Sequence, residues 1–137
     1  MDDAAFDGHL EVVKFLHEHR KEGCTKAAMD GAARNGHIEV IKWLHANRHE
    51  GCTTLAMDGA ASNGHLEVVK FLHANRHEGC TTDAMDNAAW RGGHLEVVKW
   101  LHENREEGCT KYAMAGAASH GHLEVCLLYT SPSPRDS

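Results

Sequence analysis

The chain repeats one motif, Gly-His followed by Leu or Ile, Glu and Val, five times. The motif begins at Gly8, Gly36, Gly64, Gly93 and Gly121, so successive copies are 28, 28, 29 and 28 residues apart. Self-similarity at a fixed period of about 20–50 residues is typical of solenoids, in which each repeat buries its apolar face only against its neighbours. The period therefore predicts a stacked array of short units rather than one globular core.

Two helices are predicted within each repeat, and the third copy illustrates both. The first helix should cover about residues 54–62, with Thr53 or Thr54 as its N-cap, because a threonine hydroxyl can accept a backbone N–H. It should end at Asn63, because an Asn-Gly pair suits a left-handed C-terminal turn. The second helix should follow directly, over about residues 65–75. The connection to the next copy is too short for a pair of strands, so the fold class is predicted to be all-α.

Positions that stay the same between copies indicate the buried faces of these helices. The first helix repeats its residues at offsets i, i+1, i+4 and i+5, which mark one helical face. In the third copy these residues are Ala56, Met57, Ala60 and Ala61. In the second helix the predicted face is Leu66, Val69, Leu72 and His73, with Val68 and Phe71 beside it. Because alanines let one first helix approach the next closely, the repeats should stack side by side.

The first-helix positions that differ between copies form a separate stripe, because offsets of i, i+4 and i+7 keep them on one face. This stripe is predicted to face solvent and to give each repeat its own surface chemistry. We expect a partner protein to bind the stripe and the adjoining turn of the fourth copy, which has one additional residue. The candidate partner-binding residues are Arg34, Leu55, Ser62, Asp83, Asn87, Trp90, Arg91 and Tyr112.

The turn of the fourth copy is the most distinctive part of this surface. Trp90 and Arg91 stand beside the additional residue, and Trp and Arg are enriched in binding hot spots. The alternative interpretation is that the indole only covers the inserted backbone.

Charge and hydropathy restrict the partners that the surface could bind. The chain carries 14 Lys and Arg against 20 Asp and Glu, a formal net charge of −6. A surface that follows nucleic-acid phosphates needs clustered Lys and Arg, so we expect no nucleic-acid binding. No apolar run approaches the roughly 20 residues of a membrane span, so we expect no membrane partner. The predicted partner is therefore a protein.

Four cysteines occupy one position in each repeat, and they are Cys24, Cys52, Cys80 and Cys109. Packed helices lie roughly 8–10 Å apart, whereas a disulfide needs Cα atoms within about 7 Å. A column of one cysteine per repeat is therefore predicted to be reduced and buried. That pattern is typical of an intracellular protein, either cytoplasmic or nuclear.

The recurring motif AA-x-x-GHLEVVK-x-L closely resembles the repeat motif of the ankyrin repeat family over residues 1–125. The matching residues of the third copy are Ala60, Ala61, Gly64, His65, Leu66, Glu67, Val68, Val69, Lys70 and Leu72. The period is shorter than the family's usual period of about 33 residues, and AMDG stands where the family has T-P-L-H. The resemblance indicates a short variant without the β-hairpin finger. It implies an ankyrin-like α-solenoid that acts as a protein–protein interaction module.

Histidine and cysteine together could also suggest metal binding or catalysis. His45 with His49, and His73 with His77, could each place two ligands at a helix end, with a cysteine following. However, the second histidine is Lys or Glu in other copies, and one cysteine per repeat does not converge on a four-ligand site. A pattern repeated four times also argues against a single active site. We expect packing histidines, no metal, no cofactor and no enzyme, with a His/Cys metal-binding repeat as an alternative.

Both ends of the chain depart from the repeat. Residues 1–7 align with residues 29–35, so the chain opens inside a repeat and we expect a monomeric part of a longer array. The array should cover residues 1–125, with boundaries near residues 8, 36, 64, 93 and 121 and both ends truncated. From Cys126 the sequence CLLYTSPSPRDS resembles translated sequencing adaptor, so 126–137 is expected to be read-through or a disordered tail. The alternative function is a passive spacer within a larger multidomain protein.

Overall fold

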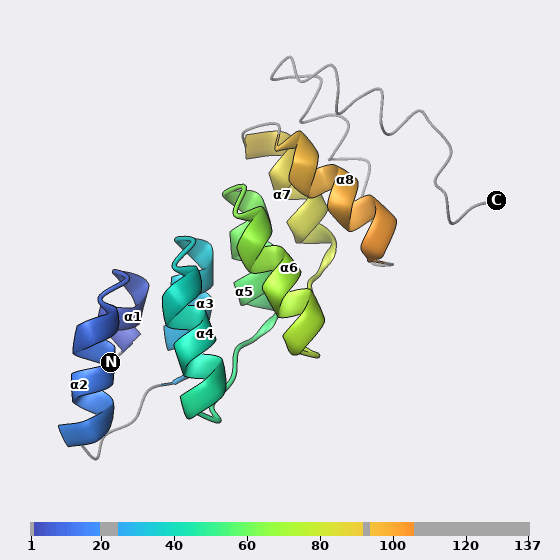
Figure 1. Cartoon of the computed structure of the whole chain (residues 1–137). Helices are drawn as coiled ribbons and strands as arrows, with labels where there is room; N and C mark the ends of the chain where they lie inside the picture. Colours follow the sequence, from blue (N-terminus) through green and yellow to red (C-terminus); the bar gives the residue numbers. More distant parts are fainter. Residues whose placement is uncertain (1, 20–24, 92–93, 106–137) are drawn as a thin grey trace.

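The computed structural model describes residues 2–19, 25–91 and 94–105, and within these ranges the chain is all-helical. Consecutive helices pair into units that lie side by side in one row (Figure 1). The helices are α1 (Asp2–Phe6), α2 (Leu10–His19), α3 (Lys26–Arg34), α4 (Ile38–Asn47), α5 (Thr54–Ser62), α6 (Leu66–Asn75), α7 (Thr82–Arg91) and α8 (Leu95–Asn104). The predictions for Cys24, Cys109, Tyr112, the fifth copy and the tail 126–137 fall outside the described residues.

Each complete first helix begins after a threonine N-cap. Thr53 has an extended backbone with φ −115°, and its Oγ1 accepts a hydrogen bond from the N–H of Leu55 at 3.1 Å. The helix then covers Thr54–Ser62, so the predicted bounds are confirmed, and Thr53 rather than Thr54 is the cap. Thr25 caps α3 in the same way. A cap of this kind stabilises a helix by roughly 1 kcal/mol.

A left-handed glycine turns the first helix into the second helix at Gly8, Gly36 and Gly64. Gly64 has φ +77°, a backbone conformation that favours glycine. The N–H of His65 donates to the carbonyl of Ala60 at 2.9 Å, and the N–H of Gly64 donates to the carbonyl of Ala61 at 3.1 Å. This is the Schellman pattern, which satisfies the last carbonyls of the helix.

The prediction that the additional residue of the fourth copy lies in this turn was wrong, because α7 takes it up: three residues separate α7 from α8, as they separate α5 from α6. The N–H of His94 donates to the carbonyl of Ala88 at 3.0 Å, so this bond spans one residue more than the bond from His65 to Ala60. The helix α7 also runs one residue further beyond its alanine pair and ends at Arg91. The insertion therefore leaves the α7–α8 pair intact.

The core of the array is a row of first helices in direct contact, α1 on α3, α3 on α5 and α5 on α7. Their recurring small residues are fully buried as predicted, and Ala60 and Ala61 are 0% exposed. Because alanine side chains are short, the backbones of neighbouring first helices can lie close together. The second helices contact one another less and lie mainly on the first helix of their own repeat.

The buried sector of α6 differs from the predicted one. Val68, Val69 and Leu72 are at most 2% exposed, whereas Leu66 and His73 are only half-buried. The prediction that put Leu66 and His73 on the buried face and Val68 beside it was wrong. The reason is that α6 packs on α5 beneath it and also on α4 and α8 beside it, which moves the buried sector toward Val68.

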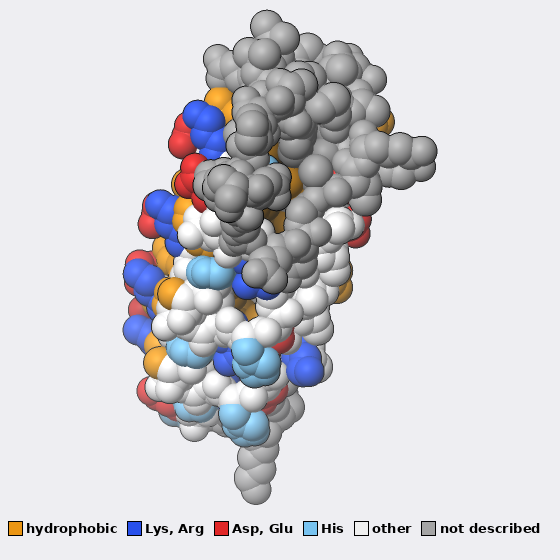
Figure 2. Space-filling model, turned by 90° about the vertical axis from the view of Figure 1, so that its right-hand side faces the viewer, with side chains coloured by type: hydrophobic (Ala, Val, Ile, Leu, Met, Phe, Trp, Pro, Cys, Tyr) orange, Lys and Arg blue, Asp and Glu red, His pale blue; other side chains and the backbone are white. Residues whose placement is uncertain are grey.

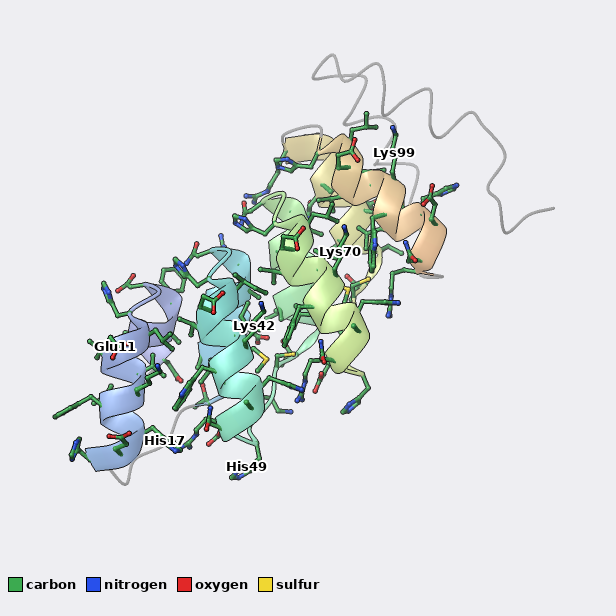
Figure 3. The ribbon with its side chains drawn as sticks, viewed as in Figure 1. Glu11, His17, Lys42, His49, Lys70 and Lys99 are labelled. Atoms are coloured by element: carbon green, nitrogen blue, oxygen red, sulfur yellow. The ribbon has the colours of Figure 1, made fainter. Side chains whose placement is uncertain are left out.

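The outer side of the second helices carries the charged residues of the repeat. Glu67 and Lys70 are exposed on α6, and the same positions recur on α4 and α8. Lys42, Lys70 and Lys99 project from this side in Figure 3, and basic and acidic side chains alternate along one edge in Figure 2. Among the described helices, none is long and apolar enough to cross a membrane.

Candidate functional site

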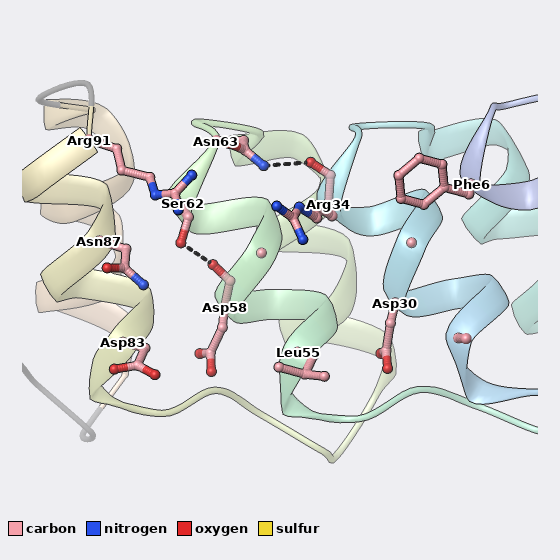
Figure 4. Close-up of a pocket in the computed structure, with 13 residues that line it drawn as sticks. Phe6, Asp30, Arg34, Leu55, Asp58, Ser62, Asn63, Asp83, Asn87 and Arg91 are labelled. Carbon is pink, nitrogen blue, oxygen red and sulfur yellow. Dashed lines mark hydrogen bonds between the residues drawn. The ribbon is translucent and has the colours of Figure 1, made fainter.

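A groove runs across the exposed sides of the first helices, with a volume of about 450 Å³. It crosses α3, α5 and α7 and is bounded by Phe6 of α1 (Figure 4). The lining residues are Phe6, Ala27, Asp30, Gly31, Arg34, Leu55, Asp58, Gly59, Ser62, Asn63, Asp83, Asn87 and Arg91. Three successive repeats therefore contribute to one continuous surface.

The floor of the groove is made of small residues, and larger side chains of the preceding repeat lie across it. A Cβ on Gly31 would come within 2.8 Å of the Phe6 ring, and one on Gly59 would come within 3.2 Å of Arg34 Cβ. Phe6 and Arg34 thus occupy space that the glycine of the next repeat leaves open. In the fourth copy this position is Asn87.

The two edges of the groove differ in charge. Arg34 and Arg91 lie on one edge in Figure 4, and the Arg91 guanidinium points toward Ser62 on the intervening helix. Within the described ranges the structure gives neither arginine an ion pair. Asp83 lies on the opposite edge, on the same side as Leu55, which is 65% exposed.

Two further carboxylates of the groove hold the repeats together. Asp58 accepts hydrogen bonds from the Thr81 N–H at 2.8 Å and from the Thr81 hydroxyl at 2.7 Å. Asp30 accepts the same two bonds from Thr53, both at 2.8 Å. The threonine that caps one first helix is thus held by the aspartate of the preceding first helix. This role was not predicted from the sequence, although a Thr follows the aspartate after 23 residues in each of these copies.

Most of the candidate partner-binding residues lie together in this groove. The members that line it are Arg34, Leu55, Ser62, Asp83, Asn87 and Arg91. Trp90 does not line the groove and is 45% exposed. Phe6 lines it but was not predicted, although aligning residues 1–7 with 29–35 places it at the same repeat position as Arg34.

Ser62 departs from the expectation that the whole stripe faces solvent. It is only 8% exposed, and its hydroxyl donates to the carbonyl of Asp58 at 2.8 Å. A serine inside a helix often bonds to the carbonyl four residues back, which draws its side chain against the helix. Ser62 therefore lines the groove with little of its side chain exposed to a partner.

Two of the histidines considered for metal binding, His45 and His73, belong to a second network, which lies between successive repeats. Arg76 pairs with Glu78 at 2.6 Å, and its Nη1 lies 3.4 Å from His45 Nδ1. Because a guanidinium can only donate, this nitrogen of His45 accepts. The His45 ring also meets Phe71 edge-on, with ring centroids 5.7 Å apart. Arg48 contacts His17 at 3.1 Å, and Arg105 contacts His73 at 3.2 Å, so the contact recurs.

The thiol of Cys52 faces the same network. Its Sγ lies 3.5 Å from Glu78 Oε1, and burial together with this carboxylate raises the pKa of Cys52 to about 12. A thiol with so high a pKa stays protonated near neutral pH, and is therefore a poor nucleophile and metal ligand. The Cys52 side chain is a free thiol, as the column of cysteines predicts. Among the described residues, no group of three or more His, Cys, Asp and Glu could hold a metal ion.

Comparison with known proteins agrees with this architecture. The family model for ankyrin repeats, described as three copies of the repeat, matches residues 1–86 and again residues 29–114. A search of the curated proteins finds no match. The first match alone covers more than half of the 137 residues, and the helix pairs, glycine turns and alanine faces fit the same repeat. The chain therefore belongs to the ankyrin repeat family.

Proposed function

We propose that this protein binds a partner protein through the groove on its first helices. Ankyrin repeats are generally protein–protein interaction modules and are typically not enzymes. The observation that carries the proposal is the continuity of the groove over repeats whose lining residues differ: Arg34 in one copy, Leu55 in the next, Asn87 in the next. A scaffold that only set a distance would not need such a surface.

The shape of the groove suits an extended segment of polypeptide. Its floor crosses three successive first helices, so one extended segment could contact residues of three repeats. Leu55 offers an exposed apolar contact beside that floor. Because the stacked repeats are already ordered, the scaffold loses little conformational entropy when a partner binds.

The charges of the groove suggest the chemistry of the segment. Arg34 and Arg91 lie on the same edge, and a carboxylate of the partner placed between them would form charge-assisted hydrogen bonds. Asp83 on the other edge favours a basic group. We therefore propose a segment with acidic and basic side chains on its two sides and an apolar side chain toward Leu55.

A photocrosslinking amino acid placed in the groove tests this function. With p-benzoylphenylalanine in place of Leu55, we expect a defined adduct from cell extract. The matched control places the same group at Lys70, which is exposed on the outer side of α6. Identical adducts from both positions, or none from either, would favour the spacer function instead.

Charge reversal then tests the groove residues directly. In Arg34→Glu with Arg91→Glu, the Leu55 adduct should weaken at least tenfold, because a carboxylate of the partner would meet two like charges. Lys42→Glu with Lys70→Glu makes the same change of charge on the outer side and should leave the adduct unchanged. Trp90→Ala with Tyr112→Ala forms a separate arm, because Trp90 lies near the end of α7 and outside the groove lining.

We also propose that the protein is located inside the cell. The reduced, buried thiol of Cys52 supports a place inside the cell, where disulfides are rare.

A further inference from the structure

Two arginines that line the groove, Arg34 and Arg91, carry charges that no contact balances. Both are exposed, and neither guanidinium makes an ion pair or a hydrogen bond with a residue that the structure describes. Arg48 and Arg76, by contrast, are each paired with a glutamate between repeats. The two arginines of the groove are therefore available to a ligand.

Both arginines reach toward the end of α5, from its two sides. Arg34 is the last residue of α3 and lies across Gly59, where a Cβ would come within 3.2 Å of the Arg34 Cβ. Arg91 is the last residue of α7, and its guanidinium points toward Ser62 (Figure 4). Since α7 has one residue more than α5 after its alanine pair, the additional residue of the fourth copy brings this second arginine to the groove.

The helix α5 places no long side chain between the two guanidiniums. Gly59 has no side chain, which lets Arg34 lie across the helix. Ser62 is only 8% exposed, because its hydroxyl donates to the carbonyl of Asp58 at 2.8 Å. A side chain of a bound segment can therefore enter between the arginines beside Ser62.

The negative groups nearest this position already have partners within the protein. The Asp58 carboxylate accepts two hydrogen bonds from Thr81. At the end of α5, the carbonyls of Gly59, Ala60 and Ala61 accept hydrogen bonds from the N–H groups that follow the helix. These oxygen atoms therefore do not neutralise the two guanidiniums by direct contact.

We propose that Arg34 and Arg91 together bind a phosphorylated side chain of the partner segment, beside Ser62. This inference rests on the proposed function, since it identifies the acidic group of that segment. A phosphate ester carries a charge of about −1.5 to −2 near pH 7 and three acceptor oxygens, so it can balance both arginines from two sides. A carboxylate has one charge and two oxygens, and it would leave the second guanidinium largely unbalanced.

A titration with small probes tests the site without the partner. The probes are N-acetyl phosphoserine amide and the corresponding glutamate derivative, and NMR follows the backbone N–H signals of Ser62 and Asn63 in the full chain. The phosphoserine probe should reach half-saturation at a concentration at least about fivefold lower than the glutamate probe, because its charge is nearly twice as large.

Variants locate the binding on the groove. In Arg34→Gln with Arg91→Gln the shifts caused by phosphoserine should disappear, and each single substitution should weaken binding, because both guanidiniums contribute. Lys42→Gln with Lys70→Gln removes the same charge from exposed positions on the outer side of the second helices and should leave the shifts unchanged. Equal half-saturation by the two probes, or no shift with phosphoserine, would overturn the proposal.

The photocrosslink at Leu55 tests whether the partner uses this site. Cell extract treated with a phosphatase that acts on phosphorylated serine, threonine and tyrosine should lose most of the adduct, compared with extract in which the phosphatase is inhibited. An adduct of equal intensity from both extracts would overturn the phosphate site and leave the proposed function intact. Absence of an adduct from both extracts would contradict the proposed function instead, and the probe titration would still decide the phosphate site.

Discussion

At the scale of single residues, two side chains of the same type can differ widely in burial. Leu72 and Leu55 are both leucines in helices of the third repeat. Leu72 is 2% exposed in the core, whereas Leu55 is 65% exposed at the edge of the groove. The comparison of repeats predicted both, because Leu72 recurs in every complete copy and Leu55 does not.

The two leucines should respond differently to truncation. Leu72→Ala removes buried methyl groups and leaves a cavity, so the free energy of unfolding should fall by about 2–5 kcal/mol. Leu55→Ala should change it by less than about 0.5 kcal/mol. Urea unfolding followed by circular dichroism measures both values. Equal losses would contradict the assignment of the groove face.

At the scale of the helices, the sequence predicts boundaries better than it predicts polar contacts. The bounds of α5 follow from local rules: a threonine cap at one end and an Asn-Gly turn at the other. The bond from Asp58 to Thr81 joins residues 23 apart and depends on how two first helices stack. The contact of Arg76 with His45 joins residues 31 apart and has the same origin. Periodicity alone could not reveal either pair.

The groove was predictable in part for the same reason. The differing positions of the first helix identified Leu55 and Arg34, because a face exposed to solvent tolerates change between copies. The depth of Ser62 was not predictable, since it depends on a hydroxyl that bonds back to its own helix. Trp90 has the residue type of a hot spot, yet it lies outside the groove lining.

The paired hydrogen bonds between the aspartate of one first helix and the capping threonine of the next, here called the Asp–Thr bracket, should stabilise the array. Asp58 is 7% exposed, and Asp58→Ala removes the carboxylate that accepts hydrogen bonds from the Thr81 N–H and hydroxyl across the two first helices. A loss of about 1–3 kcal/mol in the free energy of unfolding is expected. Asp83→Ala is the matched control, since Asp83 is exposed, and it should cost less than about 1 kcal/mol. If chemical unfolding gave the same midpoint for both variants, the bracket would have no energetic role.

At the scale of the whole array, two groups of side chains make stability depend on pH. Hydrogen bonds from Arg48 and Arg76 lower the pKa values of Glu50 and Glu78 to about 2 from 4.5. Burial lowers the pKa of His65 below its usual 6.5. In both cases the unfolded chain takes up a proton more readily than the folded chain, so stability is lost as the pH falls.

The loss should therefore occur in two pH windows. The first begins near pH 6.5, where unfolded His65 becomes charged, and the second runs from about pH 4.5 down to about 2 through the two glutamates. Melting temperatures at pH 7.5, 5.5 and 3.5 should decline in steps. His65→Gln should flatten the upper window only, and Glu78→Gln should reduce the lower one only. A melting temperature that stays constant from pH 7.5 to 3.5 would contradict both assignments.

The Asp–Thr bracket gives the array a direction. Asp30 accepts hydrogen bonds from Thr53, and Asp58 accepts them from Thr81, so in both of these pairs the aspartate of one copy binds the capping threonine of the next copy. Removing a copy from the carboxyl end would leave every remaining capping threonine with its aspartate acceptor. Removing a copy from the amino end would take the aspartate acceptor away from the capping threonine of the next copy. The fifth copy has Ala115 where the others have aspartate, so its side chain could not accept these hydrogen bonds from a threonine of a following copy. Copies with nearly the same sequence are therefore not interchangeable. Whether the duplication or loss of one copy changes these hydrogen bonds depends on the position of that copy in the array.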